Sequence, residues 1–224
     1  MTAASLDFGE ILGNSDLLLR GIGLTVALWV LAFAFALAVG LALAVARGTG
    51  RRWLAWPANV YVEVFRNTPV LVQLIWFYYA FPVMSGIQMS PFTAAAIGLS
   101  LNTSAYMSEI YRAGLESISR GQWEAGRALG MTGRKALFRI VLPQAARRMI
   151  PAFTNRGVEL AKMTSIASVL AVHELTYEAK LLSTQTFLPL ETFTVVAFIY
   201  LVLIYPGTLA ASLVERRLAG RYAT

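Results

Sequence analysis

The sequence contains no cysteine and only one histidine, His173, among its 224 residues. Without cysteine no disulfide can form, and a zinc site would lack its commonest ligands. Charged residues are scarce as well, at 14% of the chain, whereas soluble domains have about 25%. Apolar residues make up 57% of the chain, too many to be buried inside one water-facing globule. The composition therefore predicts a protein of the lipid bilayer.

The net charge of +7 does not indicate a nucleic-acid-binding protein, because the basic residues lie in short stretches between long apolar runs. The residues before the first apolar run include Asp7, Glu10 and Asp16 but no Lys or Arg up to Leu19. A secretory signal begins with basic residues. We therefore expect the first apolar run to remain in the protein as an uncleaved span.

Five apolar stretches are long enough to cross about 30 Å of hydrocarbon, which takes roughly 20 residues. There is no internal repeat and no linker between them, so residues 1–224 are predicted to form a single all-α transmembrane domain. The predicted transmembrane helices are residues 21–46, 57–84, 91–111, 150–172 and 192–214.

The positions of Lys and Arg predict the orientation of these five helices. The three segments on one side of the membrane hold 14 of the 19 basic residues, and the segments on the other side hold only Arg20 and Lys180. Cytoplasmic segments are rich in Lys and Arg. We therefore expect the N-terminus in the periplasm, and the C-terminus and the long loop after the third span in the cytoplasm.

The cytoplasmic loop, residues 116–143, has the pattern of two short helices joined by a turn. Ile118, Gln122, Ala125 and Leu129 recur at helical spacing and predict the first helix. Gly130 follows where that helix would stop, since glycine adopts the left-handed conformation of a helix end without strain.

A second helix is predicted to begin at Thr132, whose hydroxyl can cap it, and to have an apolar side that includes Ile140 and Val141. Pro143 is expected to end it, because proline disfavours helix in the preceding residue. The loop is thus predicted to be a helix–turn–helix elbow beneath the membrane. A plain interfacial helix pair that joins two spans is the alternative.

The loop resembles the EAA loop of bacterial ABC-importer permeases, Glu-Ala-Ala-x3-Gly-x9-Ile-x-Leu-Pro. Every spacing of that pattern is present, and the one departure is a glycine in place of the second alanine. The matching residues are Glu124, Ala125, Gly126, Gly130, Ile140, Leu142 and Pro143.

Three further segments resemble the polar amino-acid branch of these permeases, which includes histidine, glutamate, glutamine, arginine and opine permeases. Met163 stands where that branch has an aspartate, so this carboxylate is missing here. The three segments are residues 65–73, 109–122 and 160–166.

The resemblance implies a type I ABC-importer permease fold and ATP-driven import of polar amino acids across the bacterial inner membrane. The loop would couple the chain to a separate ATPase, present in two copies, whose closure drives alternating access. The other implied partners are a periplasmic amino-acid-binding protein and a second permease subunit, either a copy or a relative. The chain has no Walker-type phosphate loop, so ATP would be used by the ATPase and neither enzyme activity nor a cofactor is expected here.

Polar residues inside the predicted spans mark a possible substrate pathway. Charges are costly in hydrocarbon and usually face one another or a polar cavity. Glu63 and Arg66, like Arg156 and Glu159, are three residues apart and could be purely structural pairs. Pro69 interrupts the second apolar stretch, and interrupted helices at membrane depth tend to line binding cavities.

An amino-acid site needs donors for a carboxylate and acceptors for an ammonium group. Lys162 would favour an anionic side chain and Glu159 a cationic one, which leaves the substrate charge open, with a slight preference for acidic or amide amino acids. Each polar residue alone is more often a helix-packing hydrogen bond. The pathway candidates are Gln73, Asn102, Tyr106, Glu159, Lys162, Thr164 and Ser165.

Two other classes of function are open. An ion-gradient-driven secondary transporter would need no ATPase and would normally show internal repeats, which are absent. An integral-membrane enzyme would need clustered His, Asp or Cys, whereas His173 has only Glu174 beside it. We expect His173 in a periplasmic loop, either exposed or touching a binding protein, and no metal site.

Overall fold

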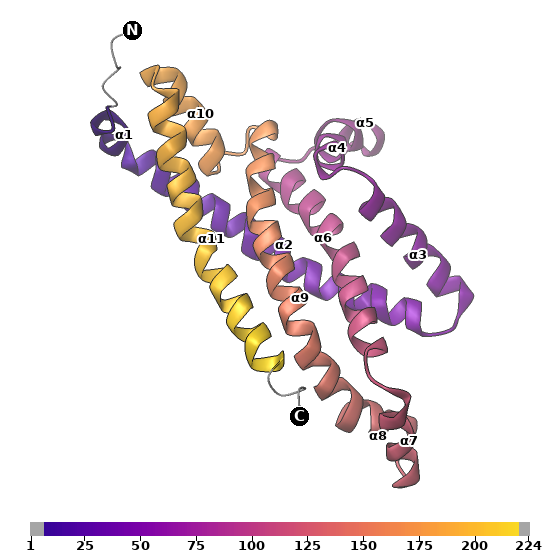
Figure 1. Cartoon of the computed structure of the whole chain (residues 1–224). Helices are drawn as coiled ribbons and strands as arrows, with labels where there is room; N and C mark the ends of the chain where they lie inside the picture. The colour runs from indigo at the N-terminus through magenta and orange to yellow at the C-terminus, as the bar shows by residue number, and fades with distance from the viewer. Residues whose placement is uncertain (1–6, 220–224) are drawn as a thin grey trace. The chain divides into compact units, whose positions relative to one another are not determined.

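A computed structural model describes residues 7–219, with side chains described up to residue 213. Every regular element in this range is helical, which confirms the predicted all-α class. The predicted sides of the chain ends concern residues 1–6 and 220–224, which lie outside the described residues. The elements (Figure 1) are α1 Gly9–Gly13, α2 Ser15–Gly48, α3 Arg52–Asn67, α4 Val70–Ile75, η1 Trp76–Ala80, α5 Phe81–Ser85, α6 Pro91–Glu116, α7 Arg120–Ala128, α8 Gly133–Ala136, η2 Leu137–Val141, α9 Leu142–Met163, η3 Thr164–Leu170, α10 Leu175–Thr186 and α11 Pro189–Ala219.

Two helices are long and apolar enough to cross a membrane: α2, and residues Pro189–Leu213 of α11. The pair Arg52–Asn67 and Val70–Ser85 passes the same test jointly, so it adds a third crossing if it is one broken span. Helices α6 and α9 overlap two further predicted spans, 91–111 and 150–172, but carry more polar residues. The count of five spans therefore stays a prediction.

The second predicted span is broken as expected. Helix α3 ends at Asn67, and Pro69 has the extended backbone angles φ −61° and ψ 134° before α4 begins. Proline disfavours helix in the preceding residue, and here the helix stops two residues before Pro69.

The fourth predicted span, 150–172, is wrong in two respects. Its α-helix starts earlier, at Leu142, and changes at Thr164 into the 3₁₀-helix η3, which ends at Leu170. The sequence analysis also missed α10, a helix in the loop before the last span, whose first turn is capped by the Glu174 side chain.

Pro143 does not end the second helix of the loop, contrary to the prediction. The chain runs without a break from α8 through the π-helical turn η2 into α9, and Pro143 is the second residue of α9. In η2 the Leu142 N–H bonds the carbonyl of Leu137, five residues back. This wider turn accommodates the missing donor and the ring of the proline. The same arrangement precedes Pro82, which follows the π-helical turn η1.

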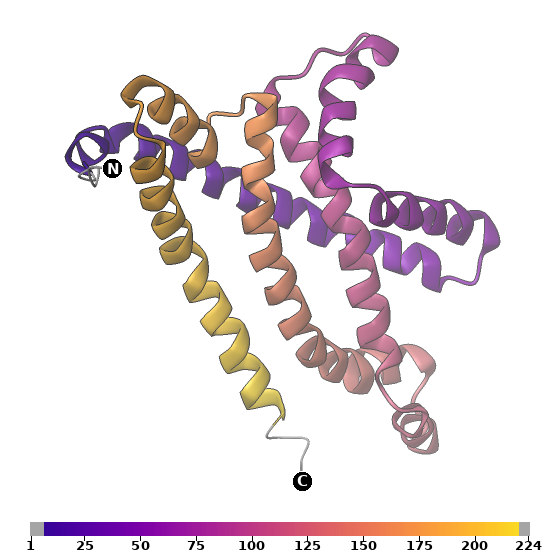
Figure 2. The ribbon, with the colours of Figure 1, turned by 45° about the horizontal axis from the view of Figure 1, so that its top comes forward.

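By its internal contacts the chain forms two compact units, and the described part of the first comprises residues 7–34, 68–100 and 158–206. One of its apolar cores joins α2, α4, α6 and η3 through Leu28, Leu74, Leu99 and Leu170. A second core joins the start of α2 to α10 and α11, which lie side by side in Figure 2.

The described part of the second unit comprises residues 35–67, 101–157 and 207–219. Helices α2 and α6 approach closely at Gly40, where a Cβ atom would lie 2.4 Å from the Cβ of Met107. The apolar core of this unit holds Ile118, Val141, Ala145 and Met149. It anchors the two short helices of loop 116–143 to the ends of α6 and α9.

Candidate functional site

The elbow, residues 116–143, contains the predicted helix–turn–helix, and Gly130 ends its first helix as predicted. Gly130 has φ +72°, the left-handed conformation. The Gly130 N–H bonds the Arg127 carbonyl at 2.9 Å, and the Met131 N–H bonds the Gly126 carbonyl at 3.0 Å. These two bonds form a Schellman motif, which satisfies carbonyls that the helix end leaves free.

The first helix of the elbow is shorter than predicted. It spans Arg120–Ala128, so Ile118 precedes it and packs instead into the apolar core of the second unit. Leu129, the last residue of the predicted apolar face, is 75% exposed. The predicted apolar face is therefore not continuous, because Ile118 is buried in the core whereas Leu129, at the tip of the elbow, is exposed.

The second helix begins at the cap that the sequence predicts. The Thr132 side chain accepts a hydrogen bond from the Lys135 N–H at 3.4 Å. Gly126 and Ala136 lie where the two helices of the elbow touch: a Cβ atom on Gly126 would be 3.1 Å from the Cβ of Ala136 and 3.2 Å from the Cδ1 of Ile140. A small residue is required at this contact, which explains why glycine can stand in place of alanine.

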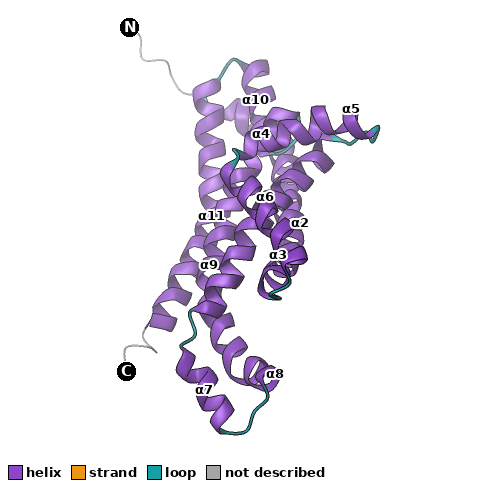
Figure 3. Cartoon of the chain, turned by 90° about the vertical axis from the view of Figure 1, so that its right-hand side faces the viewer, coloured by secondary structure: helices purple, strands orange, loops and turns teal. Residues whose placement is uncertain are grey.

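The residues of the EAA pattern differ in exposure, and Figure 3 shows the short loop that joins α7 and α8. Gly126 is buried, whereas Glu124, Ala125, Leu142 and Pro143 are exposed. No hydrogen bond or ion pair engages the Glu124 side chain within residues 7–213. The exposed residues, together with Leu129, are available to a second protein.

A cluster of charges at the end of α6 was not foreseen from the sequence. Glu109 accepts from Arg47 at 2.6 Å and from Arg112 at 2.7 Å, and Arg66 lies 3.7 Å away. Arg112 also pairs with Glu116 at 2.7 Å. The sequence signal was present, because Glu109 and Arg112 are three apart on one helix, but the partners on α2 and α3 are distant in sequence.

The possible Glu63–Arg66 pair does not form in the described part of the chain. The Glu63 carboxylate instead accepts from the Asn67 amide at 2.9 Å. Arg66 lies toward Glu109 and the ring of Tyr106, with 5.6 Å between its guanidinium carbon and the ring centroid.

Two pathway candidates, Asn102 and Tyr106, lie together in the second unit with Arg156. The Asn102 amide donates to the Phe65 carbonyl at 2.9 Å, and its oxygen accepts from Arg156 at 3.0 Å. The Tyr106 hydroxyl donates to the Arg66 carbonyl at 3.4 Å, and the Arg156 guanidinium lies 3.8 Å from the centroid of the Tyr106 ring. Both side chains thus meet the last turn of α3.

The remaining five pathway candidates belong to the first unit. Gln73 is buried, and its amide donates to the hydroxyl of Thr68 at 2.6 Å and to its carbonyl at 3.0 Å. Thr164 and Ser165 bond carbonyls of the preceding turn, those of Ala161 and Lys162. The side chains of Glu159 and Lys162 are exposed on α9. None of these observations tests substrate contact, so the seven candidates stay predictions.

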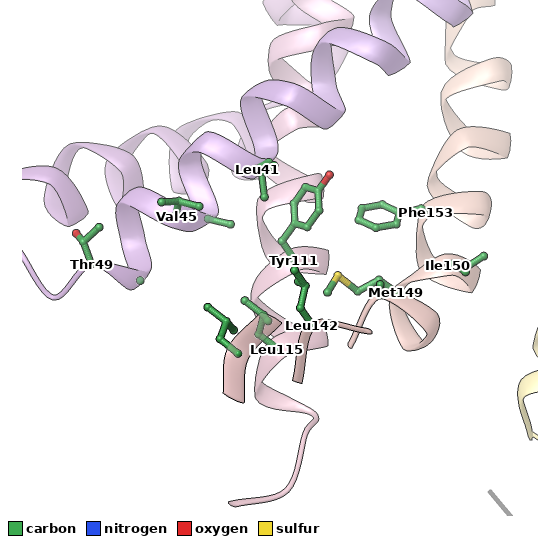
Figure 4. Close-up of a pocket in the computed structure, with 13 residues that line it drawn as sticks. Leu41, Val45, Thr49, Tyr111, Leu115, Leu142, Met149, Ile150 and Phe153 are labelled. Carbon is green, nitrogen blue, oxygen red and sulfur yellow. The ribbon is translucent and has the colours of Figure 1, made fainter. Parts of the chain in front are cut away.

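An apolar pocket of about 720 Å³ lies in the second unit (Figure 4). Tyr111, Met149 and Phe153 line it together with Leu41 and Leu142. No pathway candidate lines it, and its apolar walls do not suit a zwitterionic substrate. Among the described residues there is also no group of three or more His, Asp or Glu side chains that could hold a metal ion.

Glu174, in the first unit, is a buried carboxyl group that the sequence analysis did not single out. It accepts from the N–H groups of Thr176 and Tyr177 at 3.0 and 2.9 Å and from the Tyr200 hydroxyl at 3.0 Å. Burial raises the pKa of the Glu174 carboxyl above its ordinary value, and these hydrogen bonds oppose the shift. His173 is exposed and bonds Glu178 at 2.8 Å.

Solved structures with the same arrangement of helices are transporter subunits. The crystal structure of an amino acid ABC transporter with histidines contains a chain 33% identical to this one, with a TM-score of 0.90 over 95% of this chain and 99% of that one. The MetNI methionine ABC transporter contains a chain with a TM-score of 0.74 and 20% identity, over 92% and 97% of the two chains. These likenesses confirm the predicted type I importer permease fold.

Sequence relatives agree with this fold. The L-cystine transport system permease protein TcyB of Bacillus subtilis (strain 168) is 41% identical over 202 residues, which cover 88% of this chain and 85% of that protein. The glutamine transport system permease protein GlnP of Escherichia coli (strain K12) is 36% identical over 220 residues, or 96% and 97% of the two chains. Residues 36–220 match the model of one family. The chain therefore belongs to the binding-protein-dependent transport system inner membrane component family.

Proposed function

We propose that this chain is the membrane subunit of an ATP-driven importer of polar amino acids. The observation that carries the proposal is the elbow: two short helices fixed by a Schellman turn at Gly130 and a cap at Thr132, with an exposed tip at Leu129. A turn held at both helix ends moves as one piece. Such a piece can receive force from a second protein and pass it to α9, with which its second helix is continuous.

The partner at the elbow is an ATPase subunit, of which the full transporter has two copies. Apolar side chains at the tip supply the contact area, and the Glu124 carboxylate supplies a charge to be paired in the ATPase cleft. A second permease subunit, either a copy of this chain or a relative, completes the membrane part. ATP is hydrolysed by the ATPase subunits, and the chain itself needs no cofactor.

The substrate class follows from the relatives, which include permeases named for cystine and glutamine. A periplasmic binding protein delivers the amino acid to the outer face, and the helices alternate between outward-facing and inward-facing states. The polar side chains of the predicted spans line the route: Gln73, Asn102, Tyr106, Glu159, Lys162, Thr164 and Ser165. The chain lies in the inner membrane with the elbow on the cytoplasmic side, which the distribution of Lys and Arg supports.

Reconstitution tests this proposal. The chain is purified with its ATPase and binding protein, placed in liposomes, and supplied with radiolabelled glutamine, glutamate, cystine or arginine. We expect uptake of at least one of them only when ATP and the binding protein are both present. Uptake driven by an ion gradient without ATP would overturn the proposal and indicate a secondary transporter.

A further inference from the structure

The last turn of α3 poses a hydrogen-bonding problem that the structure solves with residues from other helices. The helix stops at Asn67, and the end of an α-helix leaves its last carbonyl groups without partners from the helix itself. Carbonyl groups left free at membrane depth are costly unless other groups bond them. Asn102 bonds the Phe65 carbonyl at 2.9 Å, and Tyr106 bonds the Arg66 carbonyl at 3.4 Å.

Asn102 is itself held by a residue of α9. Its amide oxygen accepts from the Arg156 guanidinium at 3.0 Å, and both side chains are buried, at 4% and 5% exposure. The same guanidinium lies 3.8 Å from the centroid of the Tyr106 ring, within range of a cation–π contact. Arg156 therefore contacts both of the α6 side chains that bond the end of α3.

These contacts form one continuous link inside the second unit. It runs from Arg156 on α9, through Asn102 and Tyr106 on α6, to the backbone of Phe65 and Arg66, two and one residues before the end of α3. Helix α9 continues from the second helix of the elbow without a break. The elbow is thus joined by covalent helix and by buried polar contacts to the point at which the second span is interrupted.

We propose that Arg156 is a positioning residue that holds the interrupted end of α3 to α9, so that elbow movement is transmitted to the break at Thr68 and Pro69. The proposal rests on the proposed function, because it assigns the link a part in ATP-driven transport. The α3 end and α9 then move together during the cycle. The structural change is taken up where α3 stops, and a freely rotating α3 would not open or close the route.

The chemistry of the link favours arginine at position 156. A guanidinium is planar and has several donors in a fixed geometry, so it can bond the Asn102 oxygen while stacking on the Tyr106 ring. A lysine has a compact ammonium on a flexible stem, so it cannot stack a planar group on the ring and is held less rigidly at the Asn102 oxygen. A substrate contact alone would not require the Asn102 amide to be engaged at both of its ends.

The first test measures transport against ATP use in the reconstituted complex. For Arg156→Lys and Asn102→Asp we expect uptake to fall by about tenfold while ATP hydrolysis stays within about twofold, so that more ATP is used per amino acid moved. Asn102→Asp keeps an acceptor for Arg156 but loses the donor to the Phe65 carbonyl. Thr154→Ala is the control, because the Thr154 hydroxyl bonds the Ile150 carbonyl of its own helix and takes no part in the link.

A second test distinguishes positioning from substrate binding. The chain has no native cysteine, so spin labels at Val60→Cys on α3 and Arg147→Cys on α9 are unique, and both positions are exposed. In the wild-type background we expect one narrow label-to-label distance that does not change on adding ATP. With Arg156→Lys or Asn102→Asp we expect a broader distribution.

Each outcome decides one claim. The positioning role is overturned if the variants keep one narrow label-to-label distance, or if their uptake and ATP use fall in proportion. This holds even if the wild-type complex transports normally. A wild-type complex that imports amino acids without ATP would overturn the proposed function instead. If a variant does not assemble with the ATPase, its label-to-label distance is measured in the isolated chain, which needs no partner.

Discussion

Gly40 lies at a contact between α2 and α6 where a side chain has no room. A Cβ atom there would come within 2.4 Å of the Met107 Cβ and 3.0 Å of the Ser104 carbonyl oxygen. Because a backbone atom is among these neighbours, rotation of a side chain cannot relieve the clash. The two helices would have to separate.

We predict that Gly40→Ala destabilises the folded protein by about 1–3 kcal/mol, the usual cost of overpacking a core. The measurement is thermal unfolding in detergent, monitored as the loss of the monodisperse protein peak. Gly48→Ala, in the same helix, is the matched control, because no atom lies within 4 Å of its added Cβ. Equal melting temperatures for the two variants would contradict the close contact.

Glu174 predicts a pH dependence of stability. Its pKa is raised by burial, so the folded state favours the protonated carboxyl. The contribution to stability is fully present below the ordinary glutamate pKa of about 4.3 and is lost as pH rises through the raised value. We therefore expect the melting temperature of the wild type to fall relative to that of Glu174→Gln as the pH is raised from about 4.3 toward neutral. The exposed Glu10→Gln is the control, and a parallel pH profile for wild type and Glu174→Gln would contradict the prediction.

Single polar residues were the least predictable part of the molecule. The sequence singles out Gln73, Asn102 and Tyr106 as polar groups in predicted spans, and in the structure each bonds backbone at the break in the second span. The reason is physical: an interrupted helix leaves free carbonyls, and nearby amides and hydroxyls bond them. Which helix supplies those amides and hydroxyls depends on contacts between residues far apart in sequence. Hydrophobic periodicity does not predict such contacts.

At the scale of elements, the turn of the elbow is expected to be sensitive to substitution. Gly130 has φ +72°, a conformation that costs a β-branched residue about 1–3 kcal/mol. For Gly130→Val we expect the ATPase that co-purifies to fall by about tenfold, since about 1.4 kcal/mol is a factor of ten. Membrane insertion is expected to stay normal.

Gly133→Ala is the matched control for Gly130→Val. It lies three residues away, has no neighbour within 4 Å of an added Cβ and is not among the residues with positive φ. Full ATPase association of Gly130→Val would show that the left-handed turn is not needed for docking.

The proposed docking of the elbow also predicts an effect of its charge. Glu124 is exposed and lies on α7, two residues before the contact that Gly126 makes with the second helix. We predict that Glu124→Lys abolishes ATPase association, because it places a cation where the cleft receives an anion, while Glu124→Gln weakens it only in part. Co-purification and membrane insertion are measured for both variants, and normal association of Glu124→Lys would count against the docking role.

Local signals predicted the elbow well and the proline positions less well. The helix stop at Gly130 and the cap at Thr132 are set by the backbone conformation of one residue each, so the sequence alone could identify them. Pro143 was expected to break a helix and does not; a π-helical turn precedes it, but Pro151 and Pro206 lie inside α-helices without such a turn. Pro69 breaks its helix, and no such turn precedes it. A proline in the sequence therefore does not by itself show where a helix ends.

At the scale of the whole molecule, the orientation in the membrane is the main prediction. The Leu129→Cys variant, at the exposed tip of the elbow, should react with a membrane-impermeant maleimide only after the cytoplasmic side is opened. The Gln185→Cys variant, exposed near the end of α10, should react in intact cells. Each introduced cysteine is unique in the chain. Labelling of Leu129→Cys in intact cells would show that the elbow lies on the periplasmic side, where a cytoplasmic ATPase could not contact it.

The helical class and the broken second span could be read from composition and from Pro69. The division into two compact units could not, since each unit collects parts of several helices that are distant in sequence. Apolar runs predict which residues enter the bilayer, but they do not predict which of the resulting helices contact one another. The helix boundaries also differ from the predicted spans: α9 begins eight residues earlier, at Leu142, and its residues Ala145 and Met149 pack in the apolar core of the second unit.

The π-helical turn at residues 137–141 affects how the direction of the elbow depends on the number of residues in the helix. An α-helix turns by about 100° per residue, and a π turn contains one residue more than an α turn. Deleting one residue from this turn would restore an ordinary α turn and leave the elbow facing nearly the same way, whereas deleting one residue from the regular helix of α9 would rotate the Glu124 side of the elbow by about 100° around the axis of α9. Under the proposed function, a chain shortened within α9 would turn the Glu124 side of the elbow away from the ATPase, whereas a chain shortened within the π turn would keep its docking direction.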